Sequence, residues 1–157
     1  MTDETIKKYT LKIADANKTQ IIVIVYEIAE IHLEDAIESY KDSDFDGFSN
    51  SIEKAIRCVN DLIDSLDMQY EISHRLMDIY MFINKELSVA SVTRNIVTVK
   101  KIQEFITRLK KSFEELSKQD TSGPMMGNAQ GVYAGFTYGK GSLNESIDID
   151  GNRGFKA

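Results

Sequence analysis

Apolar residues along the first 120 positions recur at helical spacing. The one stretch with another pattern is IIVIVYEIA, residues 21–29, which opens with five β-branched residues and in isolation is typical of a buried strand. The next ninety residues carry apolar side chains at steps of three and four, which predicts helices. We therefore expect residues 21–29 to be helical too, because tertiary burial overrides a propensity cost of a few tenths of a kcal/mol per residue.

Four long helices follow from this spacing, over about 17–40, 44–66, 72–90 and 96–116. The first should begin at Asn17, whose side chain can accept from exposed amides while Gln20 reaches back in a capping box. The connections between the helices are short, which favours antiparallel neighbours. The predicted fold class is therefore all-α, an antiparallel up-and-down four-helix bundle.

Glycine and proline divide the chain. Eight of the nine glycines and the only proline, Pro124, lie at or beyond Gly123. We expect an N-terminal segment over residues 1–16 packing on the bundle, the bundle over 17–120, and a glycine-rich, aromatic-containing tail over 121–157. The tail is either a flexible extension or, through residues 132–138, a plug that docks on the chain's own apolar surface.

Two predicted helices have more apolar circumference than one core can cover. Six consecutive apolar side chains, residues 21–26, point all the way around the first helix. The third helix has too many for a single stripe: Tyr70, Ile72, Leu76, Met77, Tyr80, Met81, Ile83 and Leu87. The surplus predicts a groove that accepts an amphipathic segment of a partner. Tyr26 and Tyr80 should lie at the groove rim, where a phenol keeps its hydroxyl hydrated.

Composition narrows the function. The chain has 157 residues and a formal net charge of −6, which opposes binding to nucleic acid and to anionic membranes. The N-terminus lacks the apolar core of a signal peptide, and residues 21–29 are too few to cross a bilayer, so we expect a cytoplasmic protein without membrane insertion. Cys58 should be small core filler, and His32 and His74 partly exposed polar positions. No catalytic motif is present, so we expect neither an enzyme nor a cofactor.

One motif suggests calcium. DSDFDGFSNSIE, residues 42–53, matches an EF-hand loop at Asp42, Asp44, Asp46, Gly47 and Glu53. The alternative is a tight helical turn with Ser43 or Asp44 as N-cap, which the helical register of Phe45, Phe48 and Ile52 favours. A calcium-binding helical protein stays a second hypothesis, and a homodimeric helical adaptor a third.

The capped start before IIVIVYEIA, the pair Asp44-Phe45, and above all LDMQYEISHRLMDIYMFIN, residues 66–84, resemble the flagellin-specific export chaperones of the FliS type. The resemblance covers roughly residues 9–118. It implies a bacterial cytoplasmic protein that binds the disordered C-terminal segment of flagellin, prevents its premature polymerisation, and delivers it to a component of the flagellar type III export gate.

The resemblance and the apolar surplus together define the predicted site. The resemblance also implies that a tyrosine-bearing N-terminal segment, here with Tyr9 and Ile13, lies against the bundle when no client is bound. We expect the client to contact Ile22, Val25, Tyr26, Ile72, Leu76, Met77, Tyr80, Met81, Ile83, Asn84 and Leu87.

Overall fold

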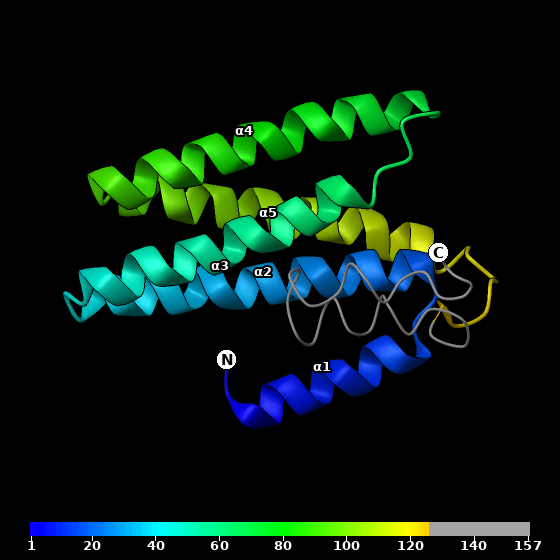
Figure 1. Cartoon of the computed structure of the whole chain (residues 1–157), viewed down its shortest axis with the longest axis horizontal. Helices are drawn as coiled ribbons and strands as arrows, with labels where there is room; N and C mark the ends of the chain where they lie inside the picture. The colour runs from blue at the N-terminus through cyan, green and yellow to red at the C-terminus, as the bar shows by residue number, and fades with distance from the viewer. Residues whose placement is uncertain (126–157) are drawn as a thin grey trace, which may run out of the picture. The chain divides into compact units, whose positions relative to one another are not determined.

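The computed structural model describes residues 1–125, which contain five α-helices and no strand. In chain order they are α1 (Asp3–Asp15), α2 (Lys18–Lys41), α3 (Phe45–Asp64), α4 (Glu71–Thr93) and α5 (Ile96–Ser117) (Figure 1). The all-α prediction is confirmed for this part of the chain. The predictions about residues 126–157, including the plug at 132–138, lie outside the described residues.

Contacts divide the chain into two compact units. Met1 and Val25–Glu115 form one, here called the helical unit, and Thr2–Ile24 with residues 116–125 belong to the other, here called the terminal unit. The division cuts through α2 and separates the last two residues of α5 from the rest. The boundaries expected from the sequence, after residues 16 and 120, rest on the helix start at Asn17 and on the glycines and proline from Gly123 onward, and they stay a prediction.

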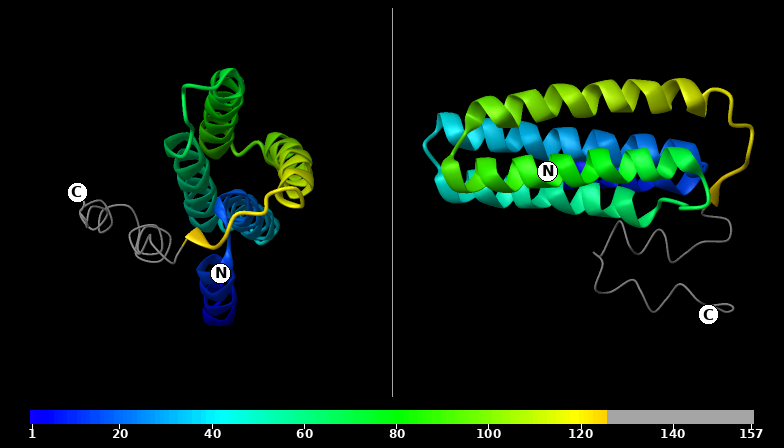
Figure 2. Two further views of the ribbon diagram at one scale, coloured as in Figure 1. Left: turned by 90° about the vertical axis from the view of Figure 1, so that its right-hand side faces the viewer. Right: turned by 90° about the horizontal axis from the view of Figure 1, so that it is seen from above.

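Four helical segments lie side by side in the helical unit: residues 25–41 of α2, α3, α4 and residues 96–115 of α5 (Figure 2). The Arg94 guanidinium lies 4.1 Å from the ring centroid of Phe45, which joins the α4–α5 turn to the α2–α3 turn. Arg94 ends α4 in the left-handed conformation. The two turns therefore meet at one end of the unit.

Helix α3 separates apolar from polar positions cleanly. Its buried residues include Phe48, Ile52, Ala55, Val59 and Leu62, at steps of four and three. Its exposed residues are polar at the complementary positions, namely Asp46, Asn50, Glu53, Arg57, Asn60 and Asp64. Such a helix has one face for the core and one for water. Helix α3 packs against α4.

The start of α3 is capped by Asp44, whose Oδ1 accepts from the Gly47 amide at 2.9 Å. Only glycine fits at position 47, because a Cβ there would clash with the Asp44 carboxylate and would lie 2.9 Å from Ser39 Oγ. The cap also uses a residue with positive φ, Ser43, to turn the chain. Asp44 was one of the two N-cap candidates in the sequence.

Replacing Asp44 by alanine is expected to lower the free energy of unfolding by about 1 kcal/mol, because the Gly47 amide loses its acceptor. The midpoint of urea unfolding measures the loss. Asp42→Ala is the matched control, since Asp42 is an exposed carboxylate two residues away that does not cap the helix. An equal loss in both variants would mean that general charge, and not the cap, stabilises α3.

Helix α2 begins with the predicted capping box. The Gln20 amide donates to Asn17 Oδ1 and the Asn17 amide donates to Gln20 Oε1, both at 2.9 Å. In the β-branched run that follows, only Ile22 is half-buried; the other residues from Ile21 to Tyr26 are each at most 9% exposed. The expectation that this run leaves an uncovered apolar face is wrong, because side chains surround it on nearly all sides.

Candidate functional site

Helix α4 carries apolar side chains on the side that faces water. Five of them are half or more exposed: Ile72, Met81, Phe82, Val89 and Val92, at 59%, 59%, 50%, 52% and 84%. Ile72, Ile79, Phe82 and Val89 follow one another at steps of seven, three and seven, so they share one stripe along the helix. We call the stripe together with Met81 and Val92 the outer face of α4.

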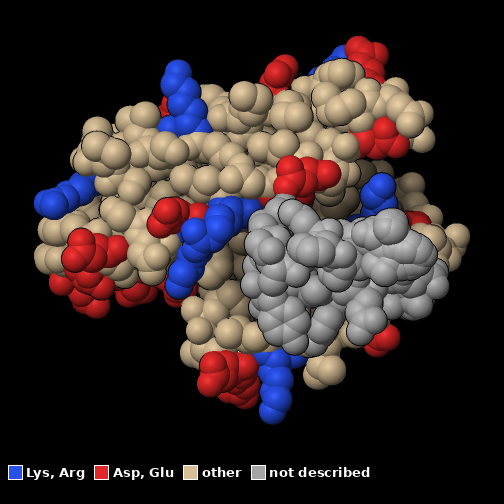
Figure 3. Space-filling model, viewed as in Figure 1, with Lys and Arg blue, Asp and Glu red and all other residues tan. Residues whose placement is uncertain are grey.

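The outer face differs from the rest of the helical unit. On α3 the exposed positions are polar, whereas on α4 apolar side chains lie between the charged residues Arg75, Asp78, Lys85 and Glu86. Figure 3 shows that Lys, Arg, Asp and Glu are sparse over the upper part of the molecule, where Figure 1 has α4. Single exposed apolar residues are ordinary, but a contiguous set along one helix marks an interaction surface.

The opposite face of α4 belongs to the core. Tyr80 there is 1% exposed, and its hydroxyl is hydrogen-bonded to that of Tyr26, which is 0% exposed. The Tyr26 ring also lies 5.6 Å from the Phe113 ring, centroid to centroid, so α2, α4 and α5 meet in one aromatic cluster. Burial raises the pKa of both phenols, so both hydroxyls stay protonated in the ordinary pH range.

The placement of Tyr26 and Tyr80 at a hydrated groove rim is therefore wrong. Each phenol finds its hydrogen-bond partner in the other phenol and has no need of water. The hydroxyl groups of the two side chains meet inside the core instead of at its edge. Neither side chain can touch a partner unless the helical unit opens.

The other predicted client-contact residues divide by burial. Ile72 and Met81 are exposed, and Ile22, Leu76, Met77 and Asn84 are half-buried. Val25, Ile83 and Leu87 are buried at 3% exposure or less, with Tyr26 and Tyr80. The prediction therefore combined exposed positions of α4 with positions buried in the core.

Sequence reasoning missed Phe82, Val89 and Val92. Phe82 and Val89 stand seven residues apart, on the side of the helix away from Tyr80, Ile83 and Leu87. Sorting the apolar residues of this helix by angle, instead of counting them, would have separated a stripe containing Phe82 from one containing Tyr80. That angular separation was the available signal.

A polar contact lies on the seam between α3 and α4. Asn84 Nδ2 donates to Asn60 Oδ1 at 2.7 Å. The Asn84 Oδ1 atom is buried and has no hydrogen-bond partner among the described residues. Asn84 is therefore held in one orientation by α3, and its side-chain nitrogen already has an acceptor within the chain.

The N-terminal segment expected from the sequence is helix α1. Thr2 caps it by accepting from the Thr5 amide at 3.2 Å. Tyr9 and Ile13, one turn apart, are its buried residues, and the Lys8 and Lys12 ammonium groups lie 5.5 and 5.0 Å from the Tyr9 ring centroid. Its role as a segment that lies on the bundle without client stays a prediction.

The structure favours the helical alternative for residues 42–53 over an EF-hand loop. From Phe45 onward this segment is the first turns of α3, and Asp44 points its carboxylate at the Gly47 amide. An EF-hand loop instead needs irregular backbone that brings Asp42, Asp44, Asp46 and Glu53 around one ion. Within residues 1–125 no group of three or more His, Cys, Asp or Glu side chains is arranged to hold a metal ion.

His74 and Cys58 lie in environments close to those expected from the sequence, whereas His32 is more buried than expected. His74 is exposed, whereas the side chain of His32 is only 12% exposed, and burial lowers its pKa to about 4 although Asp35 opposes the shift. Cys58 is buried in α3, and burial raises the pKa of its thiol to about 12. A neutral, buried thiol is a poor nucleophile.

The Cys58 thiol is expected to react with a disulfide reagent at least about a hundredfold more slowly in the native protein than in denaturant, because the reaction needs local opening of α3. The absorbance of the released thiolate measures both rates. Asn50→Cys adds an exposed thiol on the same helix and should give one fast and one slow phase. Two fast phases would contradict the burial of Cys58.

None of the helices in residues 1–125 has the length and apolar content to cross a bilayer. Residues 3–120 match the family model described as flagellar protein FliS, so the match includes all five helices. In a comparison with individually curated proteins, nothing matches the chain.

Proposed function

The chain belongs to the FliS family of flagellin-specific export chaperones, and from this premise we propose that its client is the disordered C-terminal segment of flagellin. The family supports a role as a flagellar chaperone. The single observation that carries the finer proposal is the outer face of α4, because a helix with only water to face would not keep Phe82 and Val89 half exposed.

The outer face suits a client that is disordered until it binds. Apolar side chains at steps of three and seven can receive the anchors of an amphipathic helix, and Met81 adds a side chain that adapts to its partner. Ordering a free segment costs free energy, so the contact has to be extensive. We propose that the client contacts Ile72, Met81, Phe82, Val89 and the accessible parts of Ile22, Leu76, Met77 and Asn84.

The buried members of the predicted site have a supporting role in this proposal. Val25, Tyr26, Tyr80, Ile83 and Leu87 fix the orientation of α4 from inside, so that the outer face is presented as one continuous surface. We propose that α2 to α5 work as an antiparallel up-and-down four-helix bundle. Helix α1 would lie against it through Tyr9 and Ile13 when no client is bound.

Binding would keep flagellin from polymerising before export. A segment held on the chaperone is not free to join other flagellin molecules, so we propose that the protein acts in the bacterial cytoplasm and releases its client at a component of the flagellar type III export gate. This role needs binding energy alone, without a catalytic step, a metal or another cofactor.

Isothermal titration of the full chain with a peptide of the flagellin C-terminal segment tests the client. We expect saturable heat with a negative heat-capacity change, because apolar surface is buried, and a gain in helical circular dichroism. A peptide of the flagellin N-terminal segment is the control. No heat and no spectral change with the C-terminal peptide would reject the proposal, and self-association on concentration without client would favour a homodimeric adaptor.

A further inference from the structure

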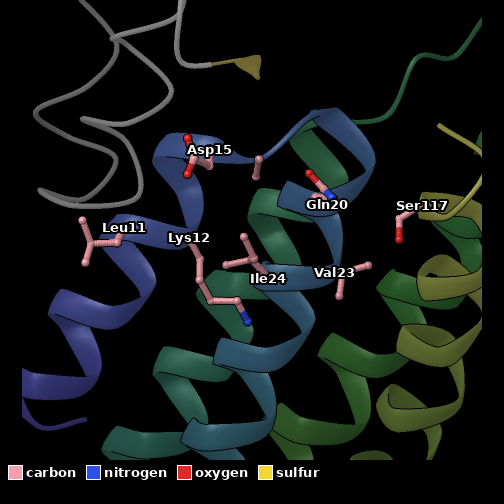
Figure 4. A pocket seen from close by; sticks show the side chains of 8 residues that line it. Leu11, Lys12, Asp15, Gln20, Val23, Ile24 and Ser117 are labelled. Atoms are coloured by element: carbon pink, nitrogen blue, oxygen red, sulfur yellow. The ribbon is translucent and has the colours of Figure 1, made fainter. Parts of the chain in front are cut away.

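The terminal unit contains a hollow of about 470 Å³. It lies between the end of α1, the first turns of α2 and the end of α5 (Figure 4). Its lining includes Leu11, Lys12 and Asp15 of α1, Val23 and Ile24 of α2, and Ser117 of α5. All of these residues belong to the terminal unit. The volume is in the range of pockets that bury a group of apolar side chains.

The hollow suits an uncharged, apolar occupant. Leu11, Val23 and Ile24 supply aliphatic surface, and Leu11 is 70% exposed at the rim. Lys12 and Asp15 carry opposite charges, so the lining has no net charge to attract an ion. An aromatic side chain would gain most here, because it buries a large area at a small cost in rotamer freedom.

After α5, residues 120–125 lie beside this hollow. The Met125 amide donates to the Ala16 carbonyl at 3.0 Å, and Ala16 is part of the lining. Thr19 Oγ1 donates to the Asp120 carboxylate at 2.6 Å, and Asn17 Nδ2 donates to the Asp120 carbonyl at 3.4 Å. Main-chain and side-chain hydrogen bonds therefore hold residues 120–125 against the α1–α2 connection and the first turn of α2.

The sequence beyond Met125 has the matching chemistry. Residues 126–138 read MGNAQGVYAGFTY and carry no charge, and from residue 132 onward they include four large apolar side chains, Val132, Tyr133, Phe136 and Tyr138. The intervening residues 126–131 include two glycines and an asparagine, which favour turns. On the scaling that holds for glycine-rich chains, six residues would span about 13 Å, so the far end would stay near its starting point at a local concentration of the order of millimolar.

We propose that residues 132–138 bind in this hollow of their own chain and clamp α1 to the start of α2. Helix α1 has 13 residues, a length that is marginally stable without tertiary support. An occupant that contacts Leu11 from α1 together with Val23 and Ile24 from α2 supplies that support. The clamp does not depend on the identity of the client.

Hydrogen exchange by NMR on the full chain tests the clamp. In a variant with Tyr133→Ser, Phe136→Ser and Tyr138→Ser, we expect the amides of α1 to exchange about tenfold faster and the signals of Gln20, Val23 and Ile24 to shift. The matched control replaces three other apolar residues of the same tail by serine, Leu143, Ile147 and Ile149. It should exchange like the wild type.

A change on the other side of the contact gives a second measurement. Leu11→Ala removes apolar surface from the rim and keeps helix propensity high. Its effect on α1 exchange should be large with the intact tail and small in the triple-serine tail, because the two changes then remove one contact. Equal exchange in wild type and triple-serine chains would overturn the proposal, as would protection that disappears on dilution, since a second copy would then be the occupant.

Discussion

Replacing Phe82 and Val89 together by serine is expected to weaken binding of the flagellin C-terminal segment about 10- to 100-fold. Both side chains lie on the outer face of α4 and are half exposed, so a partner that covers them gains apolar burial that the free protein lacks. The free energy of unfolding should fall by only about 1–2 kcal/mol, because half of each side chain is already in water and the helix propensities of serine, phenylalanine and valine are similar. Titration calorimetry and urea unfolding measure the two quantities.

Val97→Ser is the control for this experiment. Val97 is an apolar residue of α5, 58% exposed, that is not part of the outer face of α4. We expect its affinity for the client segment to stay within a factor of about two of the wild type. If Val97→Ser weakens binding as much as the α4 variant, contact is spread over general apolar surface; if neither does, the client binds elsewhere.

The helices were predictable because their signals are local. The reciprocal hydrogen bonds of Asn17 and Gln20 and the Asp44 cap each involve residues three apart, so the sequence contains the whole interaction. The spacing of apolar residues in α3 likewise predicts the helix without any knowledge of the elements that pack against it. The helical register from Phe45 likewise favours the capped turn over the calcium loop.

The candidate site was predictable only in part, because its boundary depends on tertiary packing. Periodicity shows that Tyr80 and Leu87 share one face of α4 and that Phe82 and Val89 share another, but both faces are apolar. Which face enters the core depends on what the neighbouring helices offer. For Tyr80 that partner is Tyr26, 54 positions away in sequence, and no local signal joins the two.

Replacing Tyr26 alone by phenylalanine is expected to lower the free energy of unfolding by about 1–3 kcal/mol, because the buried Tyr80 hydroxyl then has lost its partner. Replacing both Tyr26 and Tyr80 by phenylalanine should cost much less than the sum of the two single changes, since neither leaves a polar atom unpaired. Denaturant unfolding of the wild type, both single variants and the double variant gives the coupling energy. Additive losses would contradict a direct hydroxyl contact.

The same pair should limit stability in alkali. Burial raises the folded-state pKa of both phenols above the ordinary value of 10.0, so below pH 10 neither state releases these protons and the stability is fully present. Above pH 10 the unfolded chain releases them while the native protein retains them, and stability falls by up to about 1.4 kcal/mol per pH unit for each phenol. The double phenylalanine variant should therefore unfold at a higher pH than the wild type, as measured by circular dichroism between pH 9 and 12. Tyr70→Phe, at a position 62% exposed, is the control and should leave the alkaline midpoint unchanged. Equal midpoints for wild type and double variant would mean that other groups govern alkaline unfolding.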